Sequence, residues 1–140
     1  MENNRSKLLW ISFLTLVAAG IGFATRGAAG GAWADEYGIS AGQFGGIMGA
    51  GFLGFGFIIF FGGIVVEALG YKKVLLLAIV LHLISAVMLL ITPSLYSGWV
   101  ESSPDTATES TVNFLTYSVF LFSICAGLYE AVINPLVGQI

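Results

Sequence analysis

The sequence predicts an all-α integral membrane protein with four transmembrane helices, and three observations lead to this fold class. Of the 140 residues, 57% are hydrophobic and only 9% are charged, whereas a soluble domain carries about 25% charged residues. The apolar residues are gathered into four long runs, and an α-helix needs about 20 such residues to cross the hydrocarbon. Short polar or charged breaks separate the runs. The expected spans cover about residues 8–29, 41–66, 73–92 and 113–138.

The first span follows a polar and basic amino terminus. Its first part, Leu8 to Thr25, contains no charged residue, and Trp10 is expected at the inner interface, where aromatic side chains gather. Arg26 follows Lys7 by 19 residues, so we expect it towards the outer end, where a long side chain reaches the interface by snorkelling. Residues 27–39 are expected to form the outer end of this helix and a short loop.

Glycines mark one face of the second span. Ser40, just before this span, has the side chain of a helix N-cap. Small residues on one face let two membrane helices approach closely, so we predict a tight helix–helix seam here, with a seam that slides during a conformational cycle as the alternative. The glycines of this face are Gly42, Gly45, Gly49, Gly56 and Gly63.

A short charged break, residues 67–73, separates the second and third spans. The third span is expected to end before Pro93, and a polar loop over residues 93–111 then leads to the fourth span. Asn134 and Pro135 lie inside that fourth span. Since a proline frees a backbone carbonyl one turn back, we expect a kink there, with the asparagine satisfying the freed groups.

The positions of lysine and arginine predict the orientation. Arg5, Lys7, Lys72 and Lys73 fall on one side of a four-span arrangement, and the other side carries acids and no basic residue except Arg26 near a helix end. Cytoplasmic loops carry an excess of these residues. We therefore expect a protein of the plasma (inner) membrane whose amino terminus, charged break and chain end are cytoplasmic.

Several other function classes are not expected. The net charge is −3, without the basic patch of a nucleic-acid-binding protein. The single histidine has no cysteine, serine or acid at a useful spacing, and no glycine-rich loop follows a soluble strand. The only cysteine, Cys125, excludes an internal disulfide and is expected to be an inert packing thiol. We therefore expect no enzyme, no cofactor and no metal site.

The charged break resembles the signature loop of the major facilitator superfamily. The pattern runs Gly63-x-x-x-Glu67-x-x-Gly70-x-Lys72-Lys73, with glutamate in place of the usual aspartate. The first glycine would permit close helix contact, and the acid would meet a helix amino terminus or a cation from another helix. The second glycine would make the turn, and the lysines would hold the loop at the cytoplasmic surface. The resemblance implies a transporter of two six-helix halves, with these four helices as the first part of one half.

The fourth span resembles the corresponding helix of the fucose/proton symporter branch of that superfamily. In that helix a glycine is followed by a membrane-embedded glutamate and then by Asn-Pro, and the matching residues are Gly127, Glu130, Asn134, Pro135 and Val137. The glutamate is implicated in proton coupling and sugar binding in that branch. The resemblance implies this role for Glu130. The branch also has an acid in its first span, where this chain has Arg26 beside a glycine.

Three ionisable side chains fall inside the predicted spans, namely Arg26, His82 and Glu130. Such residues are costly in the hydrocarbon and are functional candidates by default. Glu130 is expected to undergo reversible protonation, with a structural ion pair or an interfacial acid as the alternative. Arg26 either snorkels or pairs with Glu130 across a central cavity. His82 is expected to be a packing residue, with a proton relay as the alternative.

Together these features predict a secondary active transporter that moves a small polar solute, with a sugar as the candidate, by proton-coupled alternating access. Residues 1–140 would form a partial amino-terminal transmembrane domain, and the remainder of the transporter would lie outside this chain. The expected partners are the solute, protons and the lipid bilayer, without nucleic acid. Two alternatives stay open: a small four-span protein that dimerises as a channel or exporter, and a non-functional truncated product.

Overall fold

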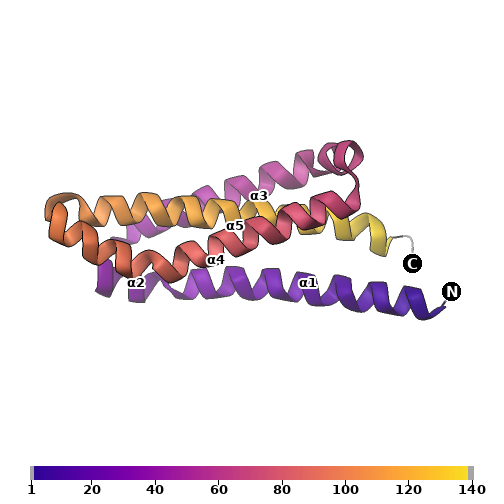
Figure 1. Ribbon diagram of the computed structural model, residues 1–140, viewed down its shortest axis with the longest axis horizontal. Coiled ribbons are helices and arrows are strands. Elements are labelled where there is room, and N and C mark those ends of the chain that lie inside the picture. The colour runs from indigo at the N-terminus through magenta and orange to yellow at the C-terminus, as the bar shows by residue number, and fades with distance from the viewer. Residues whose placement is uncertain (1, 139–140) are drawn as a thin grey trace.

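The computed structural model describes residues 2–138 and arranges them as long helices in one bundle, with no strand among these residues (Figure 1). Four of these helices, α1, α3, α4 and α5, have the length and apolar composition needed to cross a membrane. The prediction of an all-α membrane protein is therefore confirmed. The elements are α1 (Glu2–Ala28), α2 (Gly30–Tyr37), α3 (Ala41–Leu69), α4 (Tyr71–Ser102), the short 3-10 helix η1 (Pro104–Thr106) and α5 (Ala107–Val137).

Both ends of the described chain lie at the same end of the bundle, together with the connection between α3 and α4 (Figure 1). Arg5, Lys7, Lys72 and Lys73 belong to this end, because each lies near the first residue of α1 or α4. The predicted grouping of these four basic residues is therefore present in the fold. The opposite end carries the acids of α2, of the last turn of α4, of the α4–α5 connection and of the first turn of α5, which are Asp35, Glu36, Glu101, Asp105 and Glu109.

The segment between α1 and α3 differs from the loop expected over residues 27–39, because most of it forms the short helix α2. Gly38 ends this helix in the left-handed conformation, with φ of 68°, which glycine adopts without strain. Ser40 then caps α3. Its backbone N–H donates to Gln43 Oε1 at 2.9 Å, and the Gln43 N–H donates to Ser40 Oγ at 3.3 Å, so the predicted N-cap is confirmed as a full capping box.

The prediction of a polar loop over residues 93–111 is wrong. Helix α4 continues through Pro93 to Ser102, and α5 already begins at Ala107, so the connection is only residues 103–106. A proline inside a helix removes one backbone donor, and membrane helices tolerate this where nearby hydroxyl groups satisfy the backbone. The carbonyl that Pro93 frees is that of Leu89, and the hydroxyl groups nearby bond to other carbonyls: Thr92 Oγ1 donates to the Met88 carbonyl at 2.8 Å and Ser97 Oγ to the Pro93 carbonyl at 3.0 Å. The helices that contain the third and fourth predicted spans are therefore longer than the spans themselves.

Helix α5 lies at the centre of the bundle and packs against α3, α4 and α1. Its contact with α3 depends on glycines, because a Cβ added at Gly51 would lie 2.7 Å from Val119 Cγ1 and one added at Gly62 would lie 2.6 Å from Ala131 Cβ. From the α5 side, a Cβ at Gly127 would lie 2.8 Å from a side-chain atom of α3. These distances leave no room for a side chain at the interface.

The glycine face that the sequence predicted to form a helix–helix seam is not the face of α3 that meets α5. A Cβ added at any of its glycines would have no neighbour within 4 Å among the residues that the structure describes. The seven-residue repeat marked a face of α3 correctly as rich in glycine, but the helix carries a second set of glycines that faces α5. The glycines of the open face are Gly42, Gly45, Gly49, Gly56 and Gly63.

Candidate functional site

Glu130 lies in α5 at a depth well inside the apolar part of the bundle. The next residue, Ala131, is level with Gly62 of α3, as the close approach of these two residues shows. Gly62 precedes the α3–α4 connection at Gly70 by eight residues, which is about 12 Å along a helix axis. The side chain of Glu130 is partly buried. The carboxyl group therefore lies on a helix that is long and apolar enough to span a membrane, about two helical turns from the basic end of the bundle.

Glu130 borders two clefts. The smaller cleft, of about 190 Å³, lies between α3 and α5 and also has Gly63, Asn134 and Pro135 in its wall. The larger cleft, of about 360 Å³, lies where α1, α3 and α5 meet. The wall of this larger cleft is otherwise apolar or aromatic, and Glu130 is the one ionisable residue in it. The other residues of this wall are Leu16, Ala19, Gly20, Phe23, Phe52, Phe55 and Ala126.

The structure therefore brings together Glu130, Asn134 and Gly63, three of the residues singled out in the sequence. Gly63 was expected to allow close helix contact, but its neighbour Gly62 makes that contact, and Gly63 instead leaves space in the smaller cleft. Asn134 is exposed at the wall of this cleft. A carboxyl group and an amide in one cleft offer both donors and acceptors to a polar solute.

The charged connection between α3 and α4 has a clear turn residue. Gly70 has φ of 82° and links the two helices directly, and its N–H donates to the Val66 carbonyl at 2.7 Å. This φ favours glycine, which confirms the predicted turn. Glu67, Lys72 and Lys73 are all exposed. The helix amino terminus or cation that was expected to meet Glu67 stays a prediction.

Arg26 is buried in the bundle, with only 4% of its surface exposed, so snorkelling at the outer interface is the wrong prediction. One terminal nitrogen donates to Ser85 Oγ at 2.8 Å and the other donates to the Gly22 carbonyl at 3.0 Å. The guanidinium carbon lies 3.8 Å from the centre of the Phe122 ring, a cation–π contact. These three partners come from α4, α1 and α5, so Arg26 lies where these helices meet.

Two serines connect the Arg26 site to the helix interface. Ser85 Oγ accepts from Arg26 and donates to the Ser118 carbonyl at 2.7 Å. Ser118 Oγ in turn donates to the Ser85 carbonyl at 3.0 Å. Small hydroxyl residues form such hydrogen bonds between membrane helices. The reciprocal pair holds α4 against α5 and orients the acceptor for the guanidinium group.

The positive charge of Arg26 has no carboxylate partner among the residues that the structure describes. A guanidinium group has five N–H donors, and its buried Nε has no hydrogen-bond partner here. The expected pairing with Glu130 is not formed. Arg26 contacts Phe122 of α5. Phe122 precedes Glu130 by eight residues, so Arg26 and Glu130 are about 12 Å apart along the axis of α5. A buried cation without a counter-charge is unfavourable, so Arg26 remains a candidate for binding an anionic group.

His82 lies beside this cluster. Its Nδ1 is 3.4 Å from the Tyr129 hydroxyl group, and its ring meets the Phe122 ring edge to face with the centres 5.3 Å apart. His82 therefore connects the Arg26 contact at Phe122 with Tyr129, one residue before Glu130. The contact gives His82 Nδ1 a hydrogen-bonding partner, as the packing interpretation expects, and the proton relay stays a prediction.

Sequence reasoning singled out the ionisable residues. It missed Ser85 and Phe122 as partners of Arg26, Ser118 as the partner of Ser85, and Tyr129 as the hydrogen-bonding partner of His82. A signal was present for Ser85, which follows His82 by three residues and therefore shares its helix face. The α5 partners gave no such signal, because an aromatic residue or a serine in an apolar helix is common.

Comparisons with protein-family models, curated proteins and solved structures find no match to this chain. Within residues 2–138, no group of three or more His, Cys, Asp or Glu side chains is placed to hold a metal ion. The site is therefore defined by its own geometry: a partly buried carboxyl group at two clefts and a buried guanidinium group about two helical turns away.

Proposed function

We propose that this chain belongs to a secondary active transporter of the major facilitator type, similar to the fucose/proton symporter branch. In this proposal Glu130 couples a proton to the movement of a small polar solute, with a neutral sugar as the candidate. The observation that carries the proposal is the place of Glu130, whose carboxyl group borders two clefts within the membrane-spanning part of α5.

The proposed role follows from the surroundings of the carboxyl group. An ionised carboxyl group is unfavourable in an apolar environment unless a cation, a proton or hydrogen-bond donors compensate it. The cleft wall around Glu130 is mostly apolar. Protonation, or hydrogen bonds from solute hydroxyl groups, would then be linked to closure of the cleft. Asn134 supplies a second hydrogen-bonding group for the solute from one helical turn away.

Arg26 has a separate place in the proposal. Its buried guanidinium group is fixed by Ser85 and by the Phe122 ring, and its Nε still has no partner. A fixed positive charge within the membrane attracts an acidic group. We propose that this group belongs to the remainder of the transporter, where it would close the charge balance that the four helices leave open.

The orientation is also part of the proposal. Arg5, Lys7, Lys72 and Lys73 gather at one end of the bundle, and an excess of basic residues favours the cytoplasmic side. We propose that the amino terminus and the α3–α4 connection are cytoplasmic in a plasma (inner) membrane. Glu130, about 12 Å from that connection along α3, would then lie in the inner half of the membrane.

Transport in reconstituted vesicles tests the proposal. The protein expressed from its complete gene is placed in vesicles with an inwardly directed proton gradient, and the accumulation of labelled L-fucose, D-galactose and D-glucose is measured. We expect one of these sugars to accumulate only with the gradient, and accumulation to be lost in Glu130→Gln. Glu109→Gln is the matched control, because Glu109 is exposed in the first turn of the same helix. Accumulation that is equal in Glu130→Gln and the unchanged protein would contradict the role of Glu130.

A further inference from the structure

A third groove lies on the other side of α1, between α1 and α4, and shares no residue with the clefts around Glu130. Its volume is about 390 Å³. We propose that this groove binds an anionic phospholipid, with an acyl chain along the groove and the phosphate at Lys7 and Lys72. The inference does not depend on a transport function, because a four-helix membrane protein of any activity would carry the same site.

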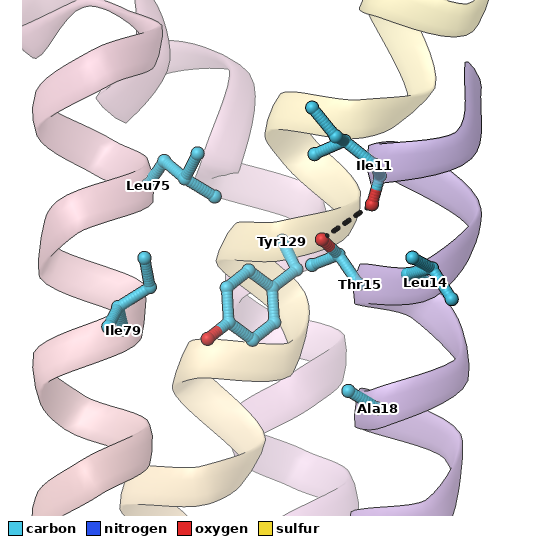
Figure 2. Close-up of a pocket in the computed structure, with 7 residues that line it drawn as sticks. All are labelled: Ile11, Leu14, Thr15, Ala18, Leu75, Ile79 and Tyr129. Atoms are coloured by element: carbon cyan, nitrogen blue, oxygen red, sulfur yellow. Dashed lines mark hydrogen bonds between the residues drawn. The ribbon is translucent and has the colours of Figure 1, made fainter. Parts of the chain in front are cut away.

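The wall of the groove suits a hydrocarbon chain. Figure 2 shows Leu75 and Ile79 of α4 facing α1 across the ring of Tyr129. Thr15 Oγ1 donates to the Ile11 carbonyl at 2.8 Å, so the one hydroxyl group on the α1 wall is already satisfied by its own helix. The Tyr129 hydroxyl group lies 3.4 Å from His82 Nδ1. The polar atoms at the groove therefore have partners within the protein, and an apolar chain leaves none of them unsatisfied.

The helix register places one lysine at the head of each wall. On α1 the groove is lined by Ile11, Thr15 and Ala18, and Lys7 precedes Ile11 by four residues. On α4, Lys72 precedes Leu75 by three residues. Residues three or four apart share one helix face, so both lysines continue the two stripes that line the groove.

Both lysines also lie at the same end of the bundle. Helices α1 and α4 begin at the same end of the bundle (Figure 1), and a helical side chain leans towards the amino terminus of its helix. The ammonium groups of Lys7 and Lys72 are therefore directed towards the membrane surface, and both residues are exposed. Trp10 is 61% exposed less than one turn from Lys7, as is typical of residues at the lipid headgroups.

The charge at the mouth of the groove selects the occupant. A basic site between membrane helices binds an anionic headgroup, and this contact adds to the apolar contact of the chain. The first turn of α4 adds to it, because its N-cap Gly70 has no side chain to cap the helix and the free N–H groups favour an anion. An apolar helix in the same groove would offer no negative group to the two lysines. The geometry therefore favours one phospholipid with a net negative headgroup over a further helix.

Two residues outside the stripes provide a matched control. Arg5 and Lys73 carry the same charges at the same end of the bundle. Arg5 lies two residues before Lys7, which turns it about 200° around α1. Lys73 lies one residue after Lys72, which turns it about 100° around α4. The double variant Arg5→Ala/Lys73→Ala therefore has the same net charge as Lys7→Ala/Lys72→Ala, but it leaves the groove lysines in place.

Native mass spectrometry of the purified protein tests the proposal, with mixed micelles that contain equal amounts of phosphatidylglycerol and phosphatidylcholine. We expect the unchanged protein to retain phosphatidylglycerol in preference to phosphatidylcholine. Lys7→Ala/Lys72→Ala is expected to weaken phosphatidylglycerol binding about 30-fold, or about fivefold for each lysine. The control variant Arg5→Ala/Lys73→Ala is expected to stay within about twofold of the unchanged protein. Equal losses in the two double variants, or no headgroup preference in the unchanged protein, would overturn the proposal.

A second variant tests the groove itself. Ala18→Phe fills the groove, so it is expected to remove the retained lipid. Leu53→Phe, at a residue of α3 that is 77% exposed, is expected to have no effect. A photoreactive residue in place of Ile79 identifies the occupant in the membrane. Crosslinks to phospholipid support the proposal, and crosslinks to another segment of the protein or to a second copy would overturn it.

Discussion

Replacing Gly62 with alanine is expected to destabilise the bundle, whereas the same change at the next residue, Gly63, is not. The new Cβ at position 62 would lie 2.6 Å from Ala131 Cβ, although ordinary contacts begin at 3.4 Å. Since the Ala131 Cβ is attached directly to the backbone of α5, it cannot rotate away, and the two helices must separate by about 0.8 Å. Overpacking of this kind costs about 1–3 kcal/mol.

The comparison with Gly63 isolates this cost. A Cβ at Gly63 would have no neighbour within 4 Å, so only the higher helix propensity of alanine acts there, and it stabilises by about 0.5–1 kcal/mol. The same propensity gain applies at Gly62 and cancels in the difference. We therefore expect the free energy of unfolding of Gly62→Ala to be lower than that of Gly63→Ala by about 1–3 kcal/mol.

Unfolding in mixed micelles of dodecyl maltoside and increasing amounts of sodium dodecyl sulfate measures this difference, with the circular dichroism of the helices as the signal. Gly56→Ala is a second control, because its Cβ would also have no neighbour within 4 Å. A Gly63→Ala or Gly56→Ala variant that is less stable than Gly62→Ala would refute the packing of α3 on α5 described above.

Three further predictions concern other parts of the chain. In the 140-residue chain on its own, Arg26→Met is expected to leave the free energy of unfolding unchanged or to raise it by about 1 kcal/mol, because the buried charge meets no carboxylate among the described residues. A loss of more than about 2 kcal/mol would show that the charge is compensated within these residues. Ser40→Ala removes the cap of α3 and is expected to lower the free energy of unfolding by about 1 kcal/mol, with faster hydrogen exchange in the first turn of α3 as the local measurement. Burial, with a smaller contribution from Glu36, raises the pKa of Tyr37 above its ordinary value of 10.0. Because the folded state then holds this proton more tightly, the contribution of Tyr37 to stability does not change with pH below about pH 10 and falls above it. The decline of the free energy of unfolding above pH 10 is expected to be smaller in Tyr37→Phe.

The fold class was predictable because it depends on the length and composition of the apolar runs, which the sequence states directly. The turn at Gly70 and the cap at Ser40 were also predictable, since both depend on neighbouring residues alone. The course of the chain from Pro93 to Thr111 was not. Proline and polar residues usually end a helix, but here α4 continues through Pro93 to Ser102, because a proline removes only one backbone donor from a long helix.

The glycine seam shows a limit of periodicity. A repeat identifies the residues that share a helix face, but it does not say which face meets another helix. Helix α3 has glycines on two faces, and the neighbours of Gly51 and Gly62 on α5 decide between them. Those neighbours are more than 60 residues away in the sequence, so the choice depends on the tertiary structure.

The candidate site was predictable to a similar extent. Spacing along α5 placed Glu130 and Asn134 on neighbouring turns, and both border one cleft. The partners of Arg26 were not predictable, because Ser85 is reached only after α4 folds back along the bundle. The depth of Arg26 was misjudged for a related reason. Helix α2 continues the chain beyond α1, so the end of α1 is not the end of the bundle.

The measurement that tests the central claim most directly separates proton coupling from solute binding in Glu130→Gln. Glutamine resembles the protonated carboxyl group in shape and hydrogen bonding, but it cannot release a proton. In vesicles that hold the sugar transported by the unchanged protein, the variant is expected to lose accumulation driven by the proton gradient and to retain exchange of labelled for unlabelled sugar at equal concentrations. Accumulation that survives the change, or that is lost equally in Glu109→Gln, would contradict the assignment of proton coupling to Glu130.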